Sequence, residues 1–328
     1  MKYLSLLSVF FYLSVIAGCA STKSGIIAQN DEFLILKTTQ SDSYETLAKK
    51  HLGHQRYASI IQRYNPGQVI QSGTHIAIPK KPINRSGVFT NGYQQVPVLC
   101  YHQFTFESQG KSRMVVTETD FEAQMKYLYE NGYNVIPLED LTPFLAGQKE
   151  LPDRSVVITI DDGYKSYLEV ALPILKKYDF HSTMFVYPEF IGAGPALKWR
   201  DVKQLSEDPL VSIQSHSKTH DSLSRRPAGE TDPDYLTRLK AEVEDAEKIL
   251  SRRTGNTVNH FAYPYGNSSV ELVNLLQEND YSIAVTVNND SNPAFSPPYL
   301  LHRTMIYGGD SIRTFEKGLR TFNKANLK

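Results

Sequence analysis

Patterns typical of strands and helices alternate along residues 96–328, and this alternation restricts the possible fold more than any other feature. Apolar runs predict strands at 98–101, 156–160, 183–187, 211–214, 259–262 and 281–287. Helical periodicity falls between them, most clearly over 117–131, 167–178, 232–254 and 269–278. Strands that alternate with helices form a parallel sheet with the helices outside. A chain segment of this length can close such a sheet into a (β/α) barrel.

A smaller unit precedes this region. Residues 33–36 and 75–79 predict strands, and residues 44–52 and 57–64 predict two helices between them. The order is therefore strand, helix, helix, strand. Residues 19–32 are mostly small and polar and predict a tether, whereas residues 80–95 are rich in Lys, Pro, Gly, Asn and Gln and predict a linker to the larger unit.

The first eighteen residues have the pattern of a secretory signal peptide. Lys2 precedes an apolar run over 4–17, which is shorter than the roughly 20 residues of a membrane-spanning helix. The run ends in Ala17-Gly18-Cys19, which resembles a bacterial lipobox and implies that Cys19 is lipidated and holds the protein on a membrane. The residue after Cys19 is Ala20, not Asp, which resembles the sorting pattern of outer-membrane lipoproteins. The protein would then lie on the outer membrane and face the periplasm. The alternative is an ordinary signal peptide, without lipid.

Charge and cysteine content exclude two further classes. Lys and Arg total 35, and Asp and Glu also total 35, so the chain lacks the basic excess of a nucleic-acid-binding protein. The two cysteines, Cys19 and Cys100, do not form a disulfide framework. Cys100 lies in an apolar run, which predicts a buried and unreactive thiol.

Polar side chains follow three of the predicted strands of the large unit. The motifs are Asp161-Asp162-Gly163, His216-Ser217-Lys218-Thr219-His220 and Tyr263-Pro264-Tyr265-Gly266. The carboxyl ends of parallel strands meet at one face of a barrel, where active sites lie. Two histidines four residues apart can reach one cation, and a third ligand would leave an open position. Ser217 replaces the glutamate of a zincin motif, so that class is excluded.

The order and spacing of these motifs resemble the NodB-like polysaccharide deacetylases of carbohydrate esterase family 4. The resemblance covers roughly residues 96–320 and implies a distorted seven-stranded barrel. It also implies that Asp161 is the general base and that Asp162, His216 and His220 bind a divalent metal ion. The ion expected is zinc, with cobalt or nickel as alternatives. The backbone N–H of Tyr265 would bind the oxyanion.

The chain departs from this family pattern at two places. Ala262 stands where the third motif has an arginine that orients the base, and Arg303 is a candidate replacement. The run Val96-Pro-Val-Leu-Cys-Tyr-His102 resembles the branch that deacetylates poly-N-acetylglucosamine, whose motifs are circularly shifted. This branch implies that His102 is the general acid. His302 is the competing choice, since it matches the usual Leu-x-His pattern.

The small unit resembles a LysM domain, in its element order and in the phrases Ile61-Gln-Arg-Tyr-Asn-Pro66 and Ile76-Ala-Ile-Pro79. LysM domains bind glycans that contain N-acetylglucosamine. The first turn, over 40–43, departs from the usual Gly-Asp-Thr type. The alternative is a packed domain that only spaces the large unit.

Taken together, these features predict a metal-dependent hydrolase that removes N-acetyl groups from a polysaccharide containing N-acetylglucosamine and releases acetate. The polymer is an exopolysaccharide or peptidoglycan. Two alternatives stay open: a non-catalytic glycan-binding lipoprotein of the cell envelope, and an esterase that acts on O-acetyl groups.

Overall fold

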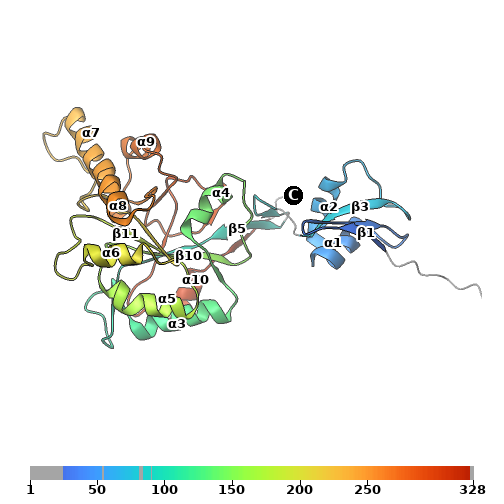
Figure 1. The fold of residues 1–328 in the computed structure, drawn as a ribbon, viewed down its shortest axis with the longest axis horizontal. Helices are drawn as coiled ribbons and strands as arrows, with labels where there is room; N and C mark the ends of the chain where they lie inside the picture. Colours follow the sequence, from blue (N-terminus) through green and yellow to red (C-terminus); the bar gives the residue numbers. More distant parts are fainter. Residues whose placement is uncertain (1–24, 54, 81–83, 90, 326–328) are drawn as a thin grey trace, which may run out of the picture. The chain divides into compact units, whose positions relative to one another are not determined.

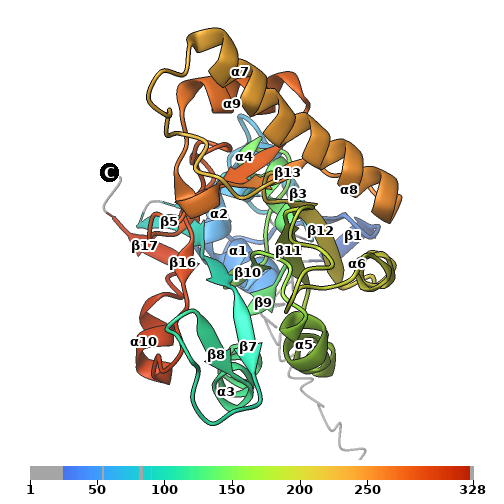
Figure 2. The ribbon, with the colours of Figure 1, turned by 90° about the vertical axis from the view of Figure 1, so that its left-hand side faces the viewer.

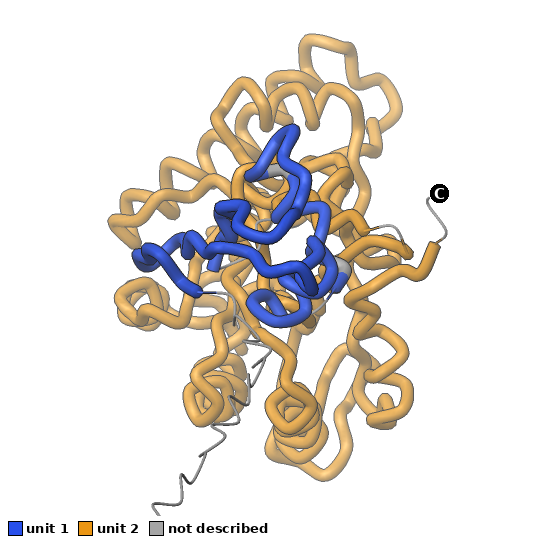
Figure 3. Tube along the Cα trace, turned by 90° about the vertical axis from the view of Figure 1, so that its right-hand side faces the viewer, with its two compact units in different colours: residues 1–83 blue, residues 84–328 orange. Residues whose placement is uncertain are grey.

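The computed structural model describes residues 25–325, except for residues 54, 81–83 and 90. The chain divides into two compact units, residues 1–83 and 84–328 (Figure 3). The predicted signal peptide and Cys19 lie outside the described residues. None of the helices within the described part combines the length and the apolar character needed to cross a membrane.

The small unit contains an antiparallel sheet in the order β1-β2-β3, with two helices between β2 and β3 (Figure 1). Its elements are β1 (Gly25–Gln29), β2 (Phe33–Lys37), α1 (Tyr44–Leu52), α2 (Ala58–Tyr64) and β3 (His75–Pro79). The predicted strand-helix-helix-strand order is present. Residues 25–29, expected in a tether, instead form the edge strand β1. Every residue of β1 is exposed, so no hydrophobic alternation marked it in the sequence.

Local polar contacts fix the helices of the small unit against its sheet. Ser43 and Thr46 form a capping box at the start of α1, and Gly53 ends this helix with a left-handed φ of 81°. The buried side chain of Asn65 donates to the carbonyls of Ile61 and Ala77, at 2.7 Å each. It also accepts a hydrogen bond from the Ala77 N–H at 2.9 Å. Asn65 therefore joins the end of α2 to β3 as a backbone strand would.

A parallel sheet forms the centre of the large unit, in the order β14-β13-β12-β11-β10-β6-β16, and β9 (Asn134–Val135) pairs with β10 beside this path. The strands of the path are β6 (Val98–Tyr101), β10 (Ser155–Ile160), β11 (Ser182–Val186), β12 (Val211–Ser215), β13 (His260–Ala262), β14 (Ile283–Val285) and β16 (Thr304–Met305). Leu301, just before β16, forms a parallel bridge with Val285 of β14. The two ends of the sheet therefore meet, and the predicted seven-stranded parallel arrangement is confirmed.

Helices surround these strands (Figure 2). They are α3 (Glu118–Glu130), α4 (Leu141–Leu145), α5 (Leu172–Lys177), α6 (Trp199–Leu205), α7 (Asp232–Lys240), α8 (Ala246–Thr254), α9 (Val270–Glu278) and α10 (Ile312–Lys317). Ser269 and Ser311 cap α9 and α10. Thr231 caps α7, and a π-helical turn over Ala241–Asp245 joins α7 to α8.

Short strands complete the large unit. β7 (Gln103–Thr105) pairs with β8 (Val115–Thr117), while β4 (Val88–Phe89), β5 (Gly92–Val96), β15 (Asn292–Pro293) and β17 (Phe322–Lys324) form a further small sheet. Residues 84–95 were expected in a linker, but β4 and β5 lie there. A Cβ on Gly92 would stand 2.0 Å from the Asn323 carbonyl, so this glycine lets β5 approach β17. The partner strand lies more than 200 residues away, and local composition cannot reveal such pairing.

Candidate active site

An ion pair between Asp161 and Arg303 lies at the carboxyl end of β10, and both side chains are buried. Arg303 Nη1 donates to Asp161 Oδ1 and Nη2 donates to Oδ2, each over 2.7 Å. The same guanidinium makes two further hydrogen bonds. Nε donates to the Thr286 carbonyl at 2.8 Å, and Nη1 donates to Thr159 Oγ1 at 3.2 Å. Arg303, the predicted candidate, thus contacts Asp161 in a chain that has Ala262 where the third motif has an arginine.

This pair keeps Asp161 ionised. Burial alone raises the pKa of Asp161, but the charge and the two hydrogen bonds of Arg303 outweigh burial and hold the pKa well below its ordinary value. The Cys100 thiol lies 3.6 Å from Asp161 Oδ2. Burial raises the pKa of Cys100 well above its ordinary value, so the thiol stays protonated beside the carboxylate, in agreement with the predicted unreactive thiol.

Asp162, His216 and His220 bring three potential metal ligands together. Asp162 Oδ1 lies 3.7 Å from His216 Nε2 and 3.6 Å from His220 Nε2, and one ligand atom from each residue lies within 4.8 Å of the others. His216 Nδ1 contacts the Ala262 carbonyl at 2.8 Å, which directs Nε2 and its lone pair toward the cluster. Two imidazoles and one carboxylate suit zinc or a similar divalent ion. The residues therefore fit the predicted metal.

The charge states of these groups also suit a cation. Burial and the neighbouring Asp161 charge raise the pKa of Asp162 to about 7. Burial lowers the pKa of His216 to about 4, so its ring is neutral near pH 7. Neutral imidazoles are the form that binds metal ions, and a cation would offset the repulsion between the two adjacent carboxylates.

Backbone strain concentrates around this cluster. Asp162, Ser217, His220 and Tyr265 have φ values of 78°, 64°, 68° and 59°, in the left-handed region that few non-glycine residues adopt. A Cβ on the next residue, Gly266, would lie 2.7 Å from the Val287 backbone nitrogen. Such strain is typical of functional sites, where the surrounding structure holds an unfavourable conformation.

A cavity of about 470 Å³ joins these groups. It is lined by Asp161, Asp162, His216, His220, Tyr265 and His102, so the structure brings together all six predicted site residues. A ring nitrogen of His102 lies within 4.8 Å of an Asp161 carboxylate oxygen. His102 Nδ1 is buried and has no hydrogen-bond partner within the described part of the chain.

His302, the alternative general acid, does not line this cavity. Its backbone N–H and carbonyl bond the side chain of Asn292, over 2.9 Å each. Since Arg303 points toward Asp161 from the same extended segment, the side chain of its neighbour His302 points to the opposite side. The geometry therefore favours His102.

Several residues of the cavity were not predicted from sequence. Ser112 and Met114 come from the segment between β7 and β8, Val287 follows β14, and Met305 belongs to β16. None is part of a recognisable motif. Strand alternation gives one signal, because Met305 stands two residues after Arg303 and therefore faces the same side. Trp199 does not line this cavity but packs against the hydrophobic core.

Comparison with known proteins agrees with this geometry. The sequence model of the family described as Polysaccharide deacetylase matches residues 148–284, which include the predicted base, metal ligands and oxyanion residue. Over these residues the large unit is similar to the polysaccharide deacetylases. This similarity confirms the predicted enzyme class, a hydrolase of the deacetylase type.

Individual relatives cover the same region. The protein YxkH of Bacillus subtilis (strain 168), whose name places it among the polysaccharide deacetylases, is 28% identical over 241 residues, which are 73% of this chain and 82% of that protein. The poly-beta-1,6-N-acetyl-D-glucosamine N-deacetylase of Escherichia coli (strain K12) is 24% identical over 258 residues. That alignment covers 68% of this chain and only 38% of the longer enzyme.

The fold is shared with a solved structure, the Streptococcus pyogenes deacetylase PplD in complex with acetate. The TM-score is 0.61 at 24% identity, over 69% of this chain and 98% of that chain. The predicted NodB-like α/β fold is therefore confirmed for the large unit. The LysM domain and the lipoprotein signal stay predictions.

We expect Arg303→Met to destabilise the large unit by about 3–5 kcal/mol at pH 7.5, because it leaves the Asp161 charge buried without its partner. Trp199 is the single tryptophan of the chain, so its fluorescence during denaturation with urea measures the unfolding of this unit.

The pH dependence provides the check. In the wild type the pKa of Asp161 is lower in the folded than in the unfolded state. Its contribution to the free energy of unfolding is therefore complete above the unfolded pKa of about 4 and disappears only as the pH falls through the folded pKa. Arg303→Met removes the strongest influence that lowers the pKa of Asp161, so burial raises the folded pKa and the deficit in unfolding free energy should shrink between pH 7.5 and pH 5. Arg226→Met, which removes an exposed pair with Asp232, is the control and should cost at most about 1 kcal/mol. A deficit that is equal in both variants, or independent of pH, would contradict the role of this pair.

Proposed function

We propose that the large unit is a metal-dependent N-deacetylase that acts on a polysaccharide containing N-acetylglucosamine and releases acetate. One observation carries the proposal: an ionised carboxylate, an Asp-His-His ligand set and a buried histidine line the same cavity. Each supplies a different requirement of amide hydrolysis, namely a base, a site for a Lewis acid and a proton donor.

Asp162, His216 and His220 would hold the metal ion, which we propose to be zinc. A divalent ion at this position supplies Lewis acidity, which polarises a carbonyl and makes water a better nucleophile at neutral pH. Asp161 lies beside this ligand set, with Oδ2 3.8 Å from His216 Nε2. Because Arg303 occupies both carboxylate oxygens from one side, Asp161 is oriented as well as ionised.

The residues of the cavity can then complete the reaction. Asp161 accepts a proton from the attacking water while the oxygen bonds to the acetyl carbon. The backbone N–H of Tyr265 donates to the carbonyl oxygen as negative charge develops on it. His102 gives a proton to the sugar nitrogen, the C–N bond breaks, and acetate and a free amine result. This last step needs a protonated His102; burial lowers the pKa of His102 below its ordinary value, and the nearby Asp161 charge opposes that shift only in part.

The two alternatives make different demands. A decayed, non-catalytic site was suggested by the missing motif arginine, but Arg303 supports Asp161 from the segment that leads into β16. An O-acetyl esterase would use the same groups on a better leaving group. Acetate release from N-acetylated and O-acetylated oligomers of the same length distinguishes it, since the esterase would act only on the latter.

We further propose that the small unit is a LysM domain that binds peptidoglycan or a similar glycan, and that lipidated Cys19 holds the protein on the periplasmic side of an outer membrane. The element order of the small unit and the Asn65 contacts support the first proposal. The sequence around Cys19 alone supports the second. The substrate is then a glycan within reach of an envelope surface, either an exopolysaccharide or peptidoglycan.

Replacing His216 with alanine should abolish metal binding and acetate release together. It removes one ligand of the cluster, and the expected loss in kcat is about 10³-fold or more, equivalent to about 4 kcal/mol. Metal content by mass spectrometry and acetate release should be measured on the same sample. His181→Ala, a histidine outside the cavity, is the control. Unchanged turnover in His216→Ala would refute the proposed site.

His102→Asn and His302→Asn should separate the two candidate acids. We expect His102→Asn to lower kcat by about 10²- to 10⁴-fold, the usual contribution of a positioned proton donor, with metal content unchanged. His302→Asn should retain nearly full activity because its side chain lies outside the cavity. The reverse pattern would assign the acid to His302.

Fractionation of cells tests the small unit and the anchor in one experiment. The Cys19→Ser variant should leave the membrane fraction but still sediment with insoluble peptidoglycan. If the variant sediments with none of the insoluble glycans tested, the small unit does not bind glycan and only spaces the large unit. Retention of the variant in the membrane fraction would exclude Cys19 as the anchor.

A further inference from the structure

The loop from His216 to His220 is held by a buried side chain outside the cavity, that of Glu242. Glu242 Oε2 accepts hydrogen bonds from the backbone N–H groups of Lys218 and Thr219, at 3.0 Å each. Glu242 Oε1 accepts from the Thr219 hydroxyl at 2.9 Å. A carboxylate that is taken out of water needs such donors, because its burial is otherwise costly. The loop supplies them, so the carboxylate and the loop stabilise each other.

The backbone of this loop adopts a conformation that needs support. Ser217 and His220 have left-handed φ values, and such conformations persist only where the surrounding structure holds them. One support comes from within the loop, where the His220 N–H donates to Ser217 Oγ at 3.0 Å. The other comes from Glu242, which binds the backbone of the residues between these two.

The two histidines are not held equally by their own side chains. His216 is buried, and its Nδ1 contacts the Ala262 carbonyl at 2.8 Å. The side chain of His220 is 22% exposed, and its ring packs against two tyrosine rings, which fix no hydrogen-bond direction. The position of His220 Nε2 therefore depends on its backbone, which directly follows the Thr219 N–H that Glu242 binds.

Glu242 belongs to an irregular part of its helix. It lies in the π-helical turn over Ala241–Asp245 that joins α7 to α8. Val243, the next residue, packs in the hydrophobic core, whereas Glu242 faces the histidine loop. Turns of this kind are rare within helices and are frequent at functional sites. The irregular turn thus coincides with the contact to the loop.

We propose that Glu242 is a positioning residue of the metal site, whose hydrogen bonds to the loop backbone hold His220 in place before a metal ion binds. The proposal rests on the metal-dependent function proposed above. A ligand set that is already ordered loses less conformational freedom on binding, so it binds the ion more tightly. Outer partners that orient metal ligands usually contribute about 10- to 100-fold in metal affinity.

The test measures the affinity of the full-length protein, freed of metal with a chelator, for Co²⁺, whose visible absorption reports the arrangement of its ligands. Glu242→Met keeps most of the side-chain volume but leaves the N–H groups of Lys218 and Thr219 without their acceptor. We expect this variant to lower Co²⁺ affinity about 10- to 100-fold and to change the absorption of the bound ion. Glu242→Gln keeps an amide oxygen for the two N–H groups, so its affinity should stay within about threefold of the wild type.

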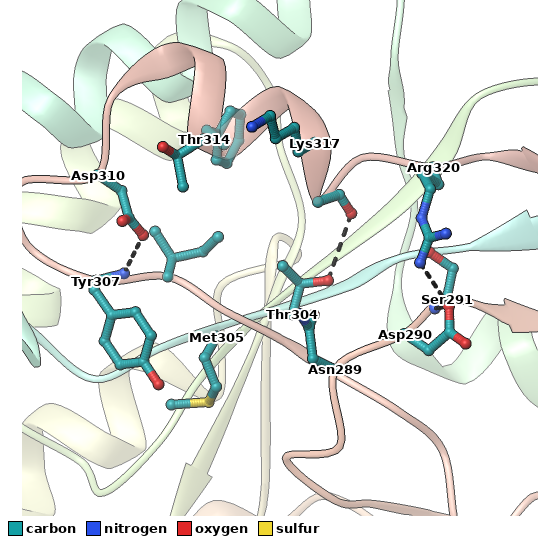
Figure 4. A pocket seen from close by; sticks show the side chains of 13 residues that line it. Asn289, Asp290, Ser291, Thr304, Met305, Tyr307, Asp310, Thr314, Lys317 and Arg320 are labelled. Atoms are coloured by element: carbon teal, nitrogen blue, oxygen red, sulfur yellow. Dashed lines mark hydrogen bonds and ion pairs between the residues drawn. The ribbon is translucent and has the colours of Figure 1, made fainter.

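Two controls separate positioning from a general loss of stability. Asp310 Oδ2 accepts from the Tyr307 N–H at 2.9 Å, in a loop that carries no proposed metal ligand (Figure 4). Asp310→Leu removes this similar contact and should leave Co²⁺ affinity within about twofold of the wild type, although it lowers resistance to urea. Asp245→Asn weakens the partly exposed pair with the Lys218 side chain, from the same π-helical turn, and should also leave the affinity unchanged.

Several outcomes would overturn the positioning role and leave the metal site intact. They are a wild-type affinity in Glu242→Met, an equal loss in Asp310→Leu, or an equal loss in Glu242→Gln, which would assign the effect to charge. Glu242→Asp, which retracts the carboxylate by one methylene group, replaces Glu242→Met in these comparisons if that variant does not fold. A wild-type protein that binds neither Co²⁺ nor Zn²⁺ would overturn both this proposal and the metal-dependent function.

Discussion

The buried ion pair between Asp161 and Arg303 is the contact on which the rest of the site depends. Taking two charges out of water costs several kcal/mol for each ion, so such a pair persists only when its geometry is good and its other polar groups are bonded. Both conditions hold here, because Arg303 also bonds the Thr286 carbonyl and Thr159 Oγ1. One guanidinium therefore connects the ends of β10 and β14 to the segment that leads into β16. The contact that orients the proposed base therefore lies where the two ends of the sheet meet.

The two adjacent carboxylates at the end of β10 have opposite properties because their surroundings differ. Arg303 holds the pKa of Asp161 well below its ordinary value, whereas burial and the Asp161 charge raise the pKa of Asp162 to about 7. The left-handed backbone at Asp162 turns its side chain away from the arginine and toward the two histidines. Neighbouring residues of identical chemistry can thus serve as base and as metal ligand, since the environment sets the role.

The sequence predicted what local patterns encode. Buried parallel strands are continuous apolar runs, and Val156–Ile160 was therefore recognisable. The helical periodicity over 232–254 and 269–278 located the outer ends of α7 and α8 and the bounds of α9 to within one residue. The motifs after the strands predicted the residues that meet in the cavity, because parallel strands end at one face.

What escaped prediction depends on distant partners. β1 carries no buried side chain, and β5 exists because β17 pairs with it. Arg303 could be suggested as a replacement for the missing arginine, but only the position of β16 beside β6 brings it to Asp161. The choice between His102 and His302 likewise required knowing which of the two side chains faces the cavity. Ser112 and Met114 belong to no motif, so no sequence signal placed them in the cavity.

The pairing of β5 with β17 places the beginning and the end of the large unit next to each other, with Gln94 opposite Phe322 and Gly92 opposite Lys324. A chain whose ends are neighbours can be opened at another surface loop and rejoined through a short connection without disturbing its interior. The functional residues of such a chain can then occur in a circularly permuted order, while their positions in space are kept. A histidine that donates the proton can therefore come from the first strand of one chain and from near the end of another, and still lie at the same place beside the base.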